Sequence, residues 1–586
     1  MEEGGGAKVV RLFAAGLVFV VIALLFQLRQ FQSFSEPAAM DAAQVGRNLA
    51  EGRGFETDWV RPFSLNLLRE HSGEEAYPLG GPIPDLNQAP AYPWMLSLLF
   101  RAVRPDMEVP RLAEFDDERP AALWRHEAET RIAILNQALF LVSLVLLYLL
   151  GLRLFDPLVG WISVIAFGGA EFFWRVSLSG LPTMLSTALI LALAHLLVSL
   201  EQRANEKDAS FPKVAILAVL AGVFVGAVAL TRYGHALLLA PALVFVGVSV
   251  KERRGAACVL LLVGFGLTVS PWIARNISVC GAPLGAAGYA LHEDSVRFPA
   301  DRLQRSLNPR NLDSPHDLTK VGLVEHWSKF WKNVGPMITE EAPRFGGSWM
   351  TAFFLAGLLA PFSRASSARL RLFVVFSAGL LAAGSLLIRS ADEGGATALL
   401  TPLAPLVFLY GAVLFSILLD QAAEPYTPKR RVVAGVFCAV ICLPLILALF
   451  SPRKVPLVYP PYHPPLLHEA AGWFEDDEVL MCDVPWAMAW YGDQPTVSLT
   501  WDLGEDFVSI HEQSLVRGLY LTSVTLDRKL VSELWEGEEI VWGRFAANSV
   551  VKGETPDGFP LTHAFSEWFP FQLLMADRPR WETRDQ

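Results

Sequence analysis

Cysteine is scarce in this sequence, and the positions of the cysteines argue against two common roles. The five cysteines among the 586 residues are Cys258, Cys280, Cys438, Cys442 and Cys482. Their spacing fits neither a zinc-ligand pattern nor a disulfide framework. Cys438 and Cys442 lie one helical turn apart in an apolar run, which favours a packing role. No cluster of His, Cys and Asp has ligand spacing, so no cofactor is certain, although a divalent metal stays possible.

Charged residues are also few. Only 18% of the residues are Asp, Glu, Lys or Arg, whereas 53% are hydrophobic, and the mean hydropathy is +0.36. Several apolar runs reach the ~20 residues that a bilayer span requires. This composition indicates a polytopic α-helical membrane protein. No small-residue cleavage site follows the first apolar run, so we expect that run to remain as an anchor.

About eleven apolar segments are expected to cross the membrane. They cover residues 9–28, 131–151, 157–176, 181–200, 214–230, 234–250, 256–273, 347–362, 372–388, 397–419 and 432–450. Basic residues gather in alternate loops, which places the N-terminus inside and the C-terminal region outside. Residues 1–450 then form the transmembrane domain, with outside loops at about 29–130 and 275–345.

The C-terminal region has a different character. Residues 451–465 are rich in proline and are expected to form a stiff linker. Residues 466–586 hold 22 acids and eight Lys or Arg, a net charge of −14, against −11 for the whole chain. Short helical and strand patterns alternate there, which predicts a soluble extracytoplasmic α/β domain with a parallel sheet. Its negative charge argues against nucleic acid as a partner.

The first outside loop contains three candidate site residues. Asp41 follows the first apolar segment and precedes a short amphipathic pattern that Gly52 ends. It can be a general base for an acceptor hydroxyl, or the N-cap of that helix. Asp85 and Tyr92 flank a proline-containing turn. Asp85 can contact substrate or can be a turn residue, and Tyr92 is expected at interface depth.

Further candidates lie where other apolar segments meet the outside surface. Arg232 follows one such segment, and Arg275 and Asn276 follow another that ends near Pro271 and Trp272. Outside arginines run against the inside bias of positive charge, and their forked donors suit a phosphate. Snorkelling and loop anchoring are the alternatives for the two arginines. Glu171 can be a second acid or a solvated charge at a helix end.

Four segments together resemble the bacterial lipid-linked-sugar glycosyltransferases of the GT-C fold. They read MDAAQVGRNLAEGRGF, QAPAYPWML, ALTRYGHALLL and SPWIARNISVCGAPL. The resemblance is closest to glycosyltransferase family 39, the branch of the protein O-mannosyltransferases and the aminoarabinose transferase of lipid A. Pro182 and Thr183 stand where that family often has a second acid.

The resemblance implies a site on the outer face of the cytoplasmic (inner) membrane. The donor would be a sugar on a polyprenyl phosphate, and the acceptor a hydroxyl of a glycan, lipid or protein. Asp41 would match the catalytic acid, with Arg232, Arg275 and Asn276 near the donor phosphate, and transfer would be inverting. The membrane lipid is a further partner. A transporter or flippase for a lipid-linked glycan stays open, as does a diverged inactive member that serves as a cell-surface scaffold.

Overall fold

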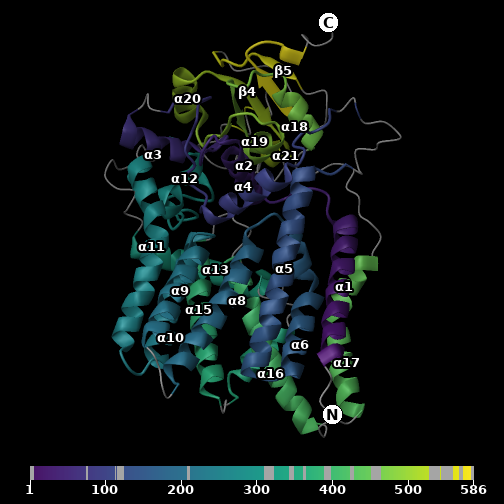
Figure 1. The fold of residues 1–586 in the computed structure, drawn as a ribbon. Helices are drawn as coiled ribbons and strands as arrows, with labels where there is room; N and C mark the ends of the chain where they lie inside the picture. Colours follow the sequence, from purple (N-terminus) through teal and green to yellow (C-terminus); the bar gives the residue numbers. More distant parts are fainter. Residues whose placement is uncertain are drawn as a thin grey trace.

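The structure is a computed structural model of the full chain. The description that follows covers residues 5–73, 77–111, 114, 124–206, 211–308, 322–341, 349–360, 364–388, 398–422, 428–450, 463–526, 542, 545, 558–565 and 572–581. The expected proline-rich linker therefore lies outside the described residues, apart from its last three positions. A helical bundle forms one end of the molecule, and a smaller region of mixed helix and sheet covers the other end (Figure 1).

Eight described helices are long and apolar enough to cross a membrane. They are α1 (Gly5–Gln30), α5 (Glu127–Leu154), α8 (Thr183–Ala204), α9 (Phe211–Ala229), α11 (Arg254–Cys280), α15 (Ala365–Leu387), α16 (Ala404–Ala422, extended by the turn Thr401–Leu403) and α17 (Pro428–Phe450). A ninth span arises if α6 (Pro157–Gly169) and α7 (Glu171–Leu178), which bend by 58° at their junction, cross together. The chain is a polytopic α-helical membrane protein.

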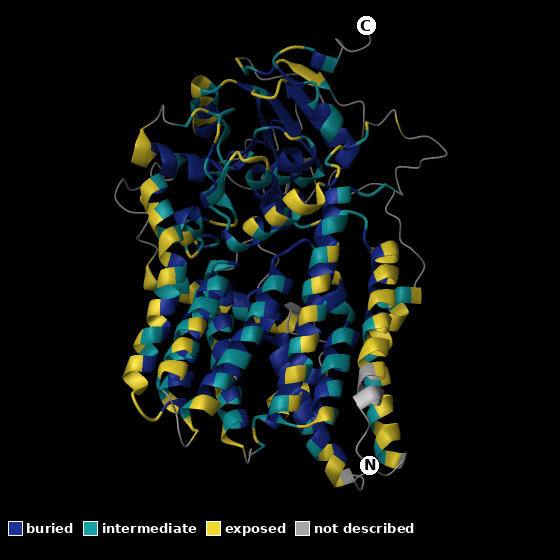
Figure 2. Ribbon diagram, in the orientation of Figure 1, coloured by how far each residue is buried: buried dark blue, intermediate teal, exposed yellow. Residues whose placement is uncertain are grey.

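The other two expected segments form shorter apolar helices. Residues 234–250 hold the 3-10 helix η3 (Tyr233–Leu238) and α10 (Leu239–Ser249), and residues 347–362 hold α14 (Trp349–Gly357). All eleven expected segments are thus helical in their described parts, although the exact number that crosses the bilayer stays a prediction. Helices at the edges of the bundle, including α1, α11 and α17, expose many apolar side chains (Figure 2). Such exposure suits contact with lipid rather than water.

The loop between α1 and α5, which keeps the name first outside loop from its expected side of the membrane, folds into a layer over the end of the bundle. Its helices are α2 (Pro37–Glu51), α3 (Pro62–Ser72) and α4 (Ala91–Val103). Pro37 is the first helical residue of α2, a position that suits proline because its missing N–H has no partner there. Gly52 ends α2 in the left-handed conformation at φ 85°, which a residue without Cβ adopts at no steric cost.

A six-stranded sheet forms the core of the C-terminal region. Its strands are β1 (Trp59–Val60), β2 (Val479–Cys482), β3 (Thr496–Ser498), β4 (Val516–Leu521), β5 (His563–Phe565) and β6 (Leu573–Ala576), in the order β1-β3-β2-β4-β6-β5. The first four strands in this order are parallel, and β6 is antiparallel to β4 and β5. The helices α18 (Pro464–Ala471), α19 (Pro485–Tyr491), α20 (Val508–Gln513) and α21 (Ser523–Leu526) accompany it. The predicted α/β region is confirmed, and its sheet is parallel in β1 to β4 but antiparallel at β6 and β5.

One strand of this sheet comes from the first outside loop. β1 pairs with β3, with Trp59 opposite Thr496 and Val60 opposite Val497. The indole of Trp59 also donates to Ser498 Oγ at 2.7 Å. The C-terminal sheet therefore holds the loop segment that follows α2. A two-residue strand carries no detectable hydrophobic period, which is why the sequence pattern did not show this pairing.

The second long loop follows α11. Its described part contains the 3-10 helix η4 (Gly285–Tyr289), α12 (Arg302–Arg305), α13 (Leu323–Pro336) and the π-helix η6 (Met337–Glu341). Arg305 ties this loop to the sheet region, because its guanidinium donates to the backbone carbonyls of Leu499 and Thr500. Both loops and the sheet thus meet above the bundle, and the candidate site lies where they meet (Figure 1).

Candidate functional site

Asp41 lies within helix α2, in its second turn, and is fully buried. The N-cap of α2 is Glu36, so the alternative interpretation of Asp41 as a helix cap is wrong. The helix starts earlier than its amphipathic pattern because Pro37 and two alanines extend it toward the bundle. The first-turn amides that Asp41 was expected to cap lie one turn away from it.

Three side-chain donors surround the Asp41 carboxylate. Arg61 Nη2 donates to Oδ2 at 2.8 Å, Gln88 Nε2 donates to the same oxygen at 2.7 Å, and Gln44 Nε2 donates to Oδ1 at 3.1 Å. A bond from a charged donor to a carboxylate is stronger than a bond between neutral groups. Asp41 is therefore an oriented carboxylate with a single cationic neighbour in direct contact among the described residues.

Arg61 connects Asp41 to the sheet. It is the residue before α3, two positions after Trp59, and its guanidinium lies 3.6 Å from the centre of the Trp59 ring. Stacking of this kind fixes a guanidinium plane and is worth about 1–2 kcal/mol when desolvated. Because β1 is held by β3, the C-terminal sheet sets the position of Trp59, and Trp59 in turn orients Arg61.

Asp85 lies beside Asp41 but makes different contacts. Its Oδ1 accepts hydrogen bonds from the backbone N–H groups of Asn87 at 3.0 Å and Gln88 at 2.8 Å, which is the geometry of an Asx turn. Burial, together with the nearby charge of Asp41, raises the pKa of Asp85 to about 6. The described contacts of Asp85 are those of a turn residue, which was the alternative to substrate contact. The turn places Gln88 where its side chain donates to Asp41.

A cavity of about 590 Å³ lies next to this pair of carboxylates. Its polar wall is formed by Trp59, Arg61, Asn87, Gln88, Thr231, Arg232, Tyr233, Glu293 and Gln304. Its apolar wall comes from η3, the end of α15 and the residues before α16, and includes Leu237, Leu380, Leu387, Ile388 and Leu399. Asp41 itself does not line the cavity. Arg61 and Gln88 lie between the two, since both line the cavity and both donate to Asp41. The cavity is therefore amphipathic, with two arginines on its polar side.

Arg232 faces this cavity from the turn between α9 and η3. Ala38, in the first turn of α2, lines the cavity as well. Burial raises the pKa of the Glu36 carboxyl against the opposing effect of the positive charge of Arg232, so these two groups lie close enough to interact. The amino end of a helix carries partial positive charge. Arg232, Arg61 and the first turn of α2 thus bring hydrogen-bond donors to this part of the cavity, with Glu36 and Asp41 as acidic neighbours of the two arginines.

Arg275 and Asn276 lie in the last part of α11, outside the cavity lining. The guanidinium of Arg275 donates to the backbone carbonyls of Asp85 at 2.6 Å and Phe55 at 3.2 Å, and to Asn276 Oδ1 at 3.0 Å. Asn276 Nδ2 donates to the backbone carbonyl of Pro283 at 3.3 Å. These contacts join the two outside loops, so Arg275 reaches the Asp41 neighbourhood through the loop that carries Asp85.

Tyr92 and Glu171 lie away from the cavity. Tyr92 is buried in α4, and its hydroxyl accepts a hydrogen bond from Asn136 Nδ2 at 3.0 Å. Glu171 starts α7 and pairs with Arg175 one turn later at 2.5 Å. Neither side chain lines the cavity.

The residues around Asp41 do not fit a metal ion in this arrangement. No group of three or more His, Cys, Asp or Glu residues that could hold a metal ion occurs among the described residues. Both Asp41 oxygens already accept hydrogen bonds, and Arg61 stands in direct contact where a cation would bind. A hard divalent ion such as Mg²⁺ prefers several oxygen ligands. Beside Asp41 the positive charge is supplied by the guanidinium of Arg61, which takes the place that such an ion would need.

The polar cavity residues Arg61, Gln88, Glu293 and Gln304 were not predicted from the sequence. Glu293 is buried, and its Oε1 accepts a hydrogen bond from Gln304 Nε2 at 2.5 Å. Gln88 begins the quoted QAPAYPWML segment but was not singled out there, and the other three residues stand outside the quoted segments. Only the meeting of both outside loops with the sheet brings these four residues together.

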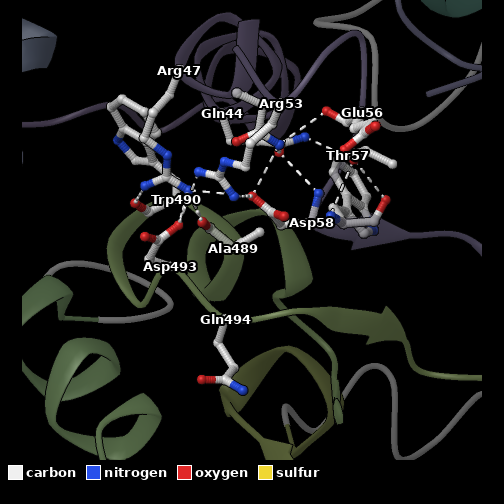
Figure 3. A network of polar contacts seen from close by, with 12 residues as sticks. Gln44, Arg47, Arg53, Glu56, Thr57, Asp58, Ala489, Trp490, Asp493 and Gln494 are labelled. Carbon is white, nitrogen blue, oxygen red and sulfur yellow. Dashed lines mark hydrogen bonds and ion pairs between the residues drawn. The ribbon is translucent and has the colours of Figure 1, made fainter. Parts of the chain in front are cut away.

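A second polar network fixes the other end of α2 to the C-terminal region (Figure 3). Arg47 donates to the backbone carbonyls of Ala489 at 2.9 Å and Trp490 at 3.2 Å, at the end of α19, and pairs with Asp493 at 2.6 Å. Helix carboxyl ends expose carbonyls without intrahelical partners, and an arginine satisfies them. Asp58 accepts from Arg47 and from Asn48 on the same helix. Helix α2 is thus held at both ends, by Arg61 through Asp41 and by α19 through Arg47.

Comparison with known proteins identifies the fold. No protein-family model and no curated protein sequence matches this chain. The oligosaccharyltransferase of Archaeoglobus fulgidus, solved with a tethered acceptor peptide, aligns over 96% of this chain and 74% of its own length, with a TM-score of 0.55 and 12% identity. ArnT from Cupriavidus metallidurans, solved with bound undecaprenyl phosphate, aligns over 97% of this chain and 98% of its own, with a TM-score of 0.51 and 12% identity. The chain therefore has the GT-C fold that the sequence motifs predicted.

Proposed function

We propose that this protein is a membrane glycosyltransferase that moves a sugar from a polyprenyl-phosphate donor to an acceptor hydroxyl. The observation that carries the proposal is Arg61, which binds Asp41 at 2.8 Å and also lines the cavity. One side chain thus connects a buried carboxylate to the space where a phosphate would lie. The GT-C fold supports the proposal, since a solved neighbour with this fold holds undecaprenyl phosphate.

The cavity suits a donor with a polar head and a hydrocarbon tail. Arg232, Arg61 and the amino end of α2 would face the phosphate, because forked guanidinium donors and helix N-termini both stabilise anions. The apolar wall from η3 and α15 would contact the first prenyl units. Arg275 and Asn276 would act indirectly, by holding the segments around Asp85 and Pro283 in place. Tyr92 and Glu171 would make no direct contact with the donor.

In the proposed reaction the acceptor oxygen attacks the anomeric carbon as the bond from that carbon to the phosphate oxygen breaks. The phosphate leaves with the bonding electrons, and Arg61 and Arg232 stabilise its growing charge. Asp41 accepts the proton of the acceptor hydroxyl. This step requires Arg61 or Gln88 to move aside, because these two side chains separate Asp41 from the cavity. Attack opposite the leaving group inverts the anomeric configuration. Arg61, Gln44 and Gln88 hold the Asp41 carboxylate in place through their hydrogen bonds.

The site would lie on the outer face of the inner membrane, where sugar nucleotides are absent and a lipid carrier supplies the activated sugar. The loops and sheet above the cavity would then contact the acceptor.

The test uses purified protein in nanodiscs, with binding of polyprenyl phosphate and transfer of a labelled sugar measured separately. We expect Asp41→Asn to retain lipid binding and to lose transfer by about 10²–10⁴-fold, the usual contribution of a general base. Arg232→Ala is expected to weaken lipid binding. Glu171→Gln, which removes a charge outside the cavity, serves as the matched control. Transfer by Asp41→Asn at the wild-type rate would refute the proposed base, and lipid transport without transfer would instead favour a flippase.

A further inference from the structure

Helix α13, in the second outside loop, has its polar and apolar faces reversed relative to a surface helix in water. Leu323, Trp327 and Trp331 of α13 follow one another at intervals of four residues and are 89%, 62% and 56% exposed. Ile338 of the adjoining η6, seven residues further on, is 64% exposed. Lys329 and Asn333, on the opposite face, are buried at 3% and 2% exposure. A surface helix in water normally buries the apolar stripe and exposes the charged one.

The buried face of α13 is held by polar contacts. Lys329 Nζ donates to the backbone carbonyls of Leu291 and Glu293, and Asn333 Nδ2 donates to the backbone carbonyl of Leu386 at 2.9 Å. Lys332 pairs with Asp294 at 3.1 Å. The orientation of α13 is therefore fixed by specific bonds that turn its aromatic face outward. On that face the ring of Trp331 packs edge to face against Trp327 and Phe330, and the rings of Trp327 and Phe330 are stacked, with ring centres 5.6–5.9 Å apart.

The bond from Asn333 to Leu386 sets the depth of the helix. Leu386 lies in the last turn of α15, a helix long and apolar enough to cross the membrane. Helix α13 therefore packs where a span leaves the bilayer, at the end of the bundle that carries the sheet region (Figure 1). Tryptophan is enriched at this depth in membrane proteins, because its ring is apolar and its N–H is polar.

We propose that the aromatic face of α13 is embedded in the lipid of the leaflet on the side of the cavity. With 14 residues the helix is about 21 Å long, too short for the ~30 Å hydrocarbon core, so it would lie at the interface. The lysines of α13 point to the protein or bind Asp294, so the contact is with the acyl and glycerol region rather than with anionic headgroups.

This contact has a consequence for the cavity. The carbonyls that Lys329 and Asn333 bind belong to segments that also form cavity wall, since Leu291, Glu293, Ser385 and Leu387 line the cavity. Lipid that holds α13 in place would thereby stabilise this wall of the cavity, past which a lipid-linked substrate would enter. The lipid contact itself does not depend on the proposed reaction.

The experiment measures depth in the bilayer by spin labelling of the full chain. The five native cysteines are replaced by alanine, and single cysteines are introduced as Trp327→Cys, Trp331→Cys and Ser328→Cys for labelling with nitroxide. Ser328 is the matched control, because it is exposed on the same helix but outside the apolar stripe. After reconstitution, oxygen and a water-soluble nickel chelate compete as relaxing agents. We expect labels at 327 and 331 to be relaxed by oxygen several-fold more than by nickel, and the label at 328 to show the opposite.

Equal access of nickel at 327, 331 and 328 would overturn the proposal, as it would show that the face contacts water. Shielding of 327 and 331 from both agents would also overturn it, because it would indicate a protein partner or a second copy. If the cysteine-free chain does not fold, brominated lipids provide a second measurement in the native background. Their quenching of tryptophan fluorescence should fall in Trp327→Phe/Trp331→Phe, and unchanged quenching would refute the lipid contact.

Discussion

The pair formed by Asp41 and Arg61 makes a quantitative prediction about the stability of the site. Asp41 is fully buried and the Arg61 side chain is 8% exposed, so each charge depends on the other. Removal of one partner from a buried ion pair leaves an uncompensated charge and typically costs about 3–5 kcal/mol. Arg61→Met should therefore destabilise the protein strongly, although Gln44 and Gln88 still donate to Asp41.

The double variant distinguishes coupling between the two charges from a general loss of stability caused by each substitution. In Asp41→Asn/Arg61→Met neither charge remains, so the double variant should be more stable than Arg61→Met alone. Residues in direct contact commonly show coupling energies of about 0.5–3 kcal/mol. The assay is the midpoint of thermal unfolding in detergent or nanodiscs for the wild type, both single variants and the double variant, with all four purified in the same way.

The pair of Glu171 and Arg175 provides the control. It has a similar distance, 2.5 Å, but Arg175 is 70% exposed. Exposed pairs of this kind contribute about 0–1 kcal/mol, so Arg175→Met should change the midpoint very little. If the effects of Asp41→Asn and Arg61→Met add up in the double variant, the two charges are not coupled and the argument for an oriented carboxylate fails.

Two further predictions concern the surroundings of the site. Asp85 has a pKa raised to about 6 by burial and by Asp41, above its ordinary value of 3.8, so its stabilising contribution is present below about pH 4 and is lost as the pH rises through 6. The thermal midpoint of the wild type should fall more across that window than the midpoint of Asp85→Asn. The amide oxygen of this variant can still accept hydrogen bonds from the backbone of Asn87 and Gln88. Identical pH profiles of the two proteins would contradict this expectation. The isolated C-terminal region, residues 463–586, lacks β1 and leaves the edge of β3 open, so we expect it to aggregate when expressed alone. A peptide covering residues 55–64 should bind it and reduce aggregation, whereas a monomeric region indifferent to the peptide would show that β1 is dispensable.

Local patterns in the sequence were sufficient for the helices of the membrane domain and for β2, β3 and β4. Apolar runs of about 20 residues predict spans because backbone groups in lipid must be paired within the segment. Alternating helix and strand patterns predicted the parallel part of the sheet in the same way. These are features of single segments, so they need no knowledge of what lies beside them.

The candidate site was predictable only in part. Asp41 stood out as an acid just after the first apolar segment, and Arg232 because an outside arginine runs against the inside bias of positive charge. The structure places both at or next to the cavity. Arg275 stood out for the same reason, but its contacts are with loop carbonyls. An arginine beside a membrane looks the same in sequence whether it faces a cavity or a backbone.

The sequence by itself determined that this chain spans a membrane many times, carries an acidic α/β region at its C-terminal end, and has the GT-C fold. Hydropathy and periodicity are sums over neighbouring residues, which is enough for the first two properties. The GT-C fold was instead implied by the resemblance of four short segments to that family. Tertiary structure alone decided that β1 joins a sheet more than 400 residues away, that Arg61 and Gln88 stand between Asp41 and the cavity, and that α13 turns its tryptophans outward. Each of these depends on contacts between distant segments, whose free energy is gained only when the chain folds.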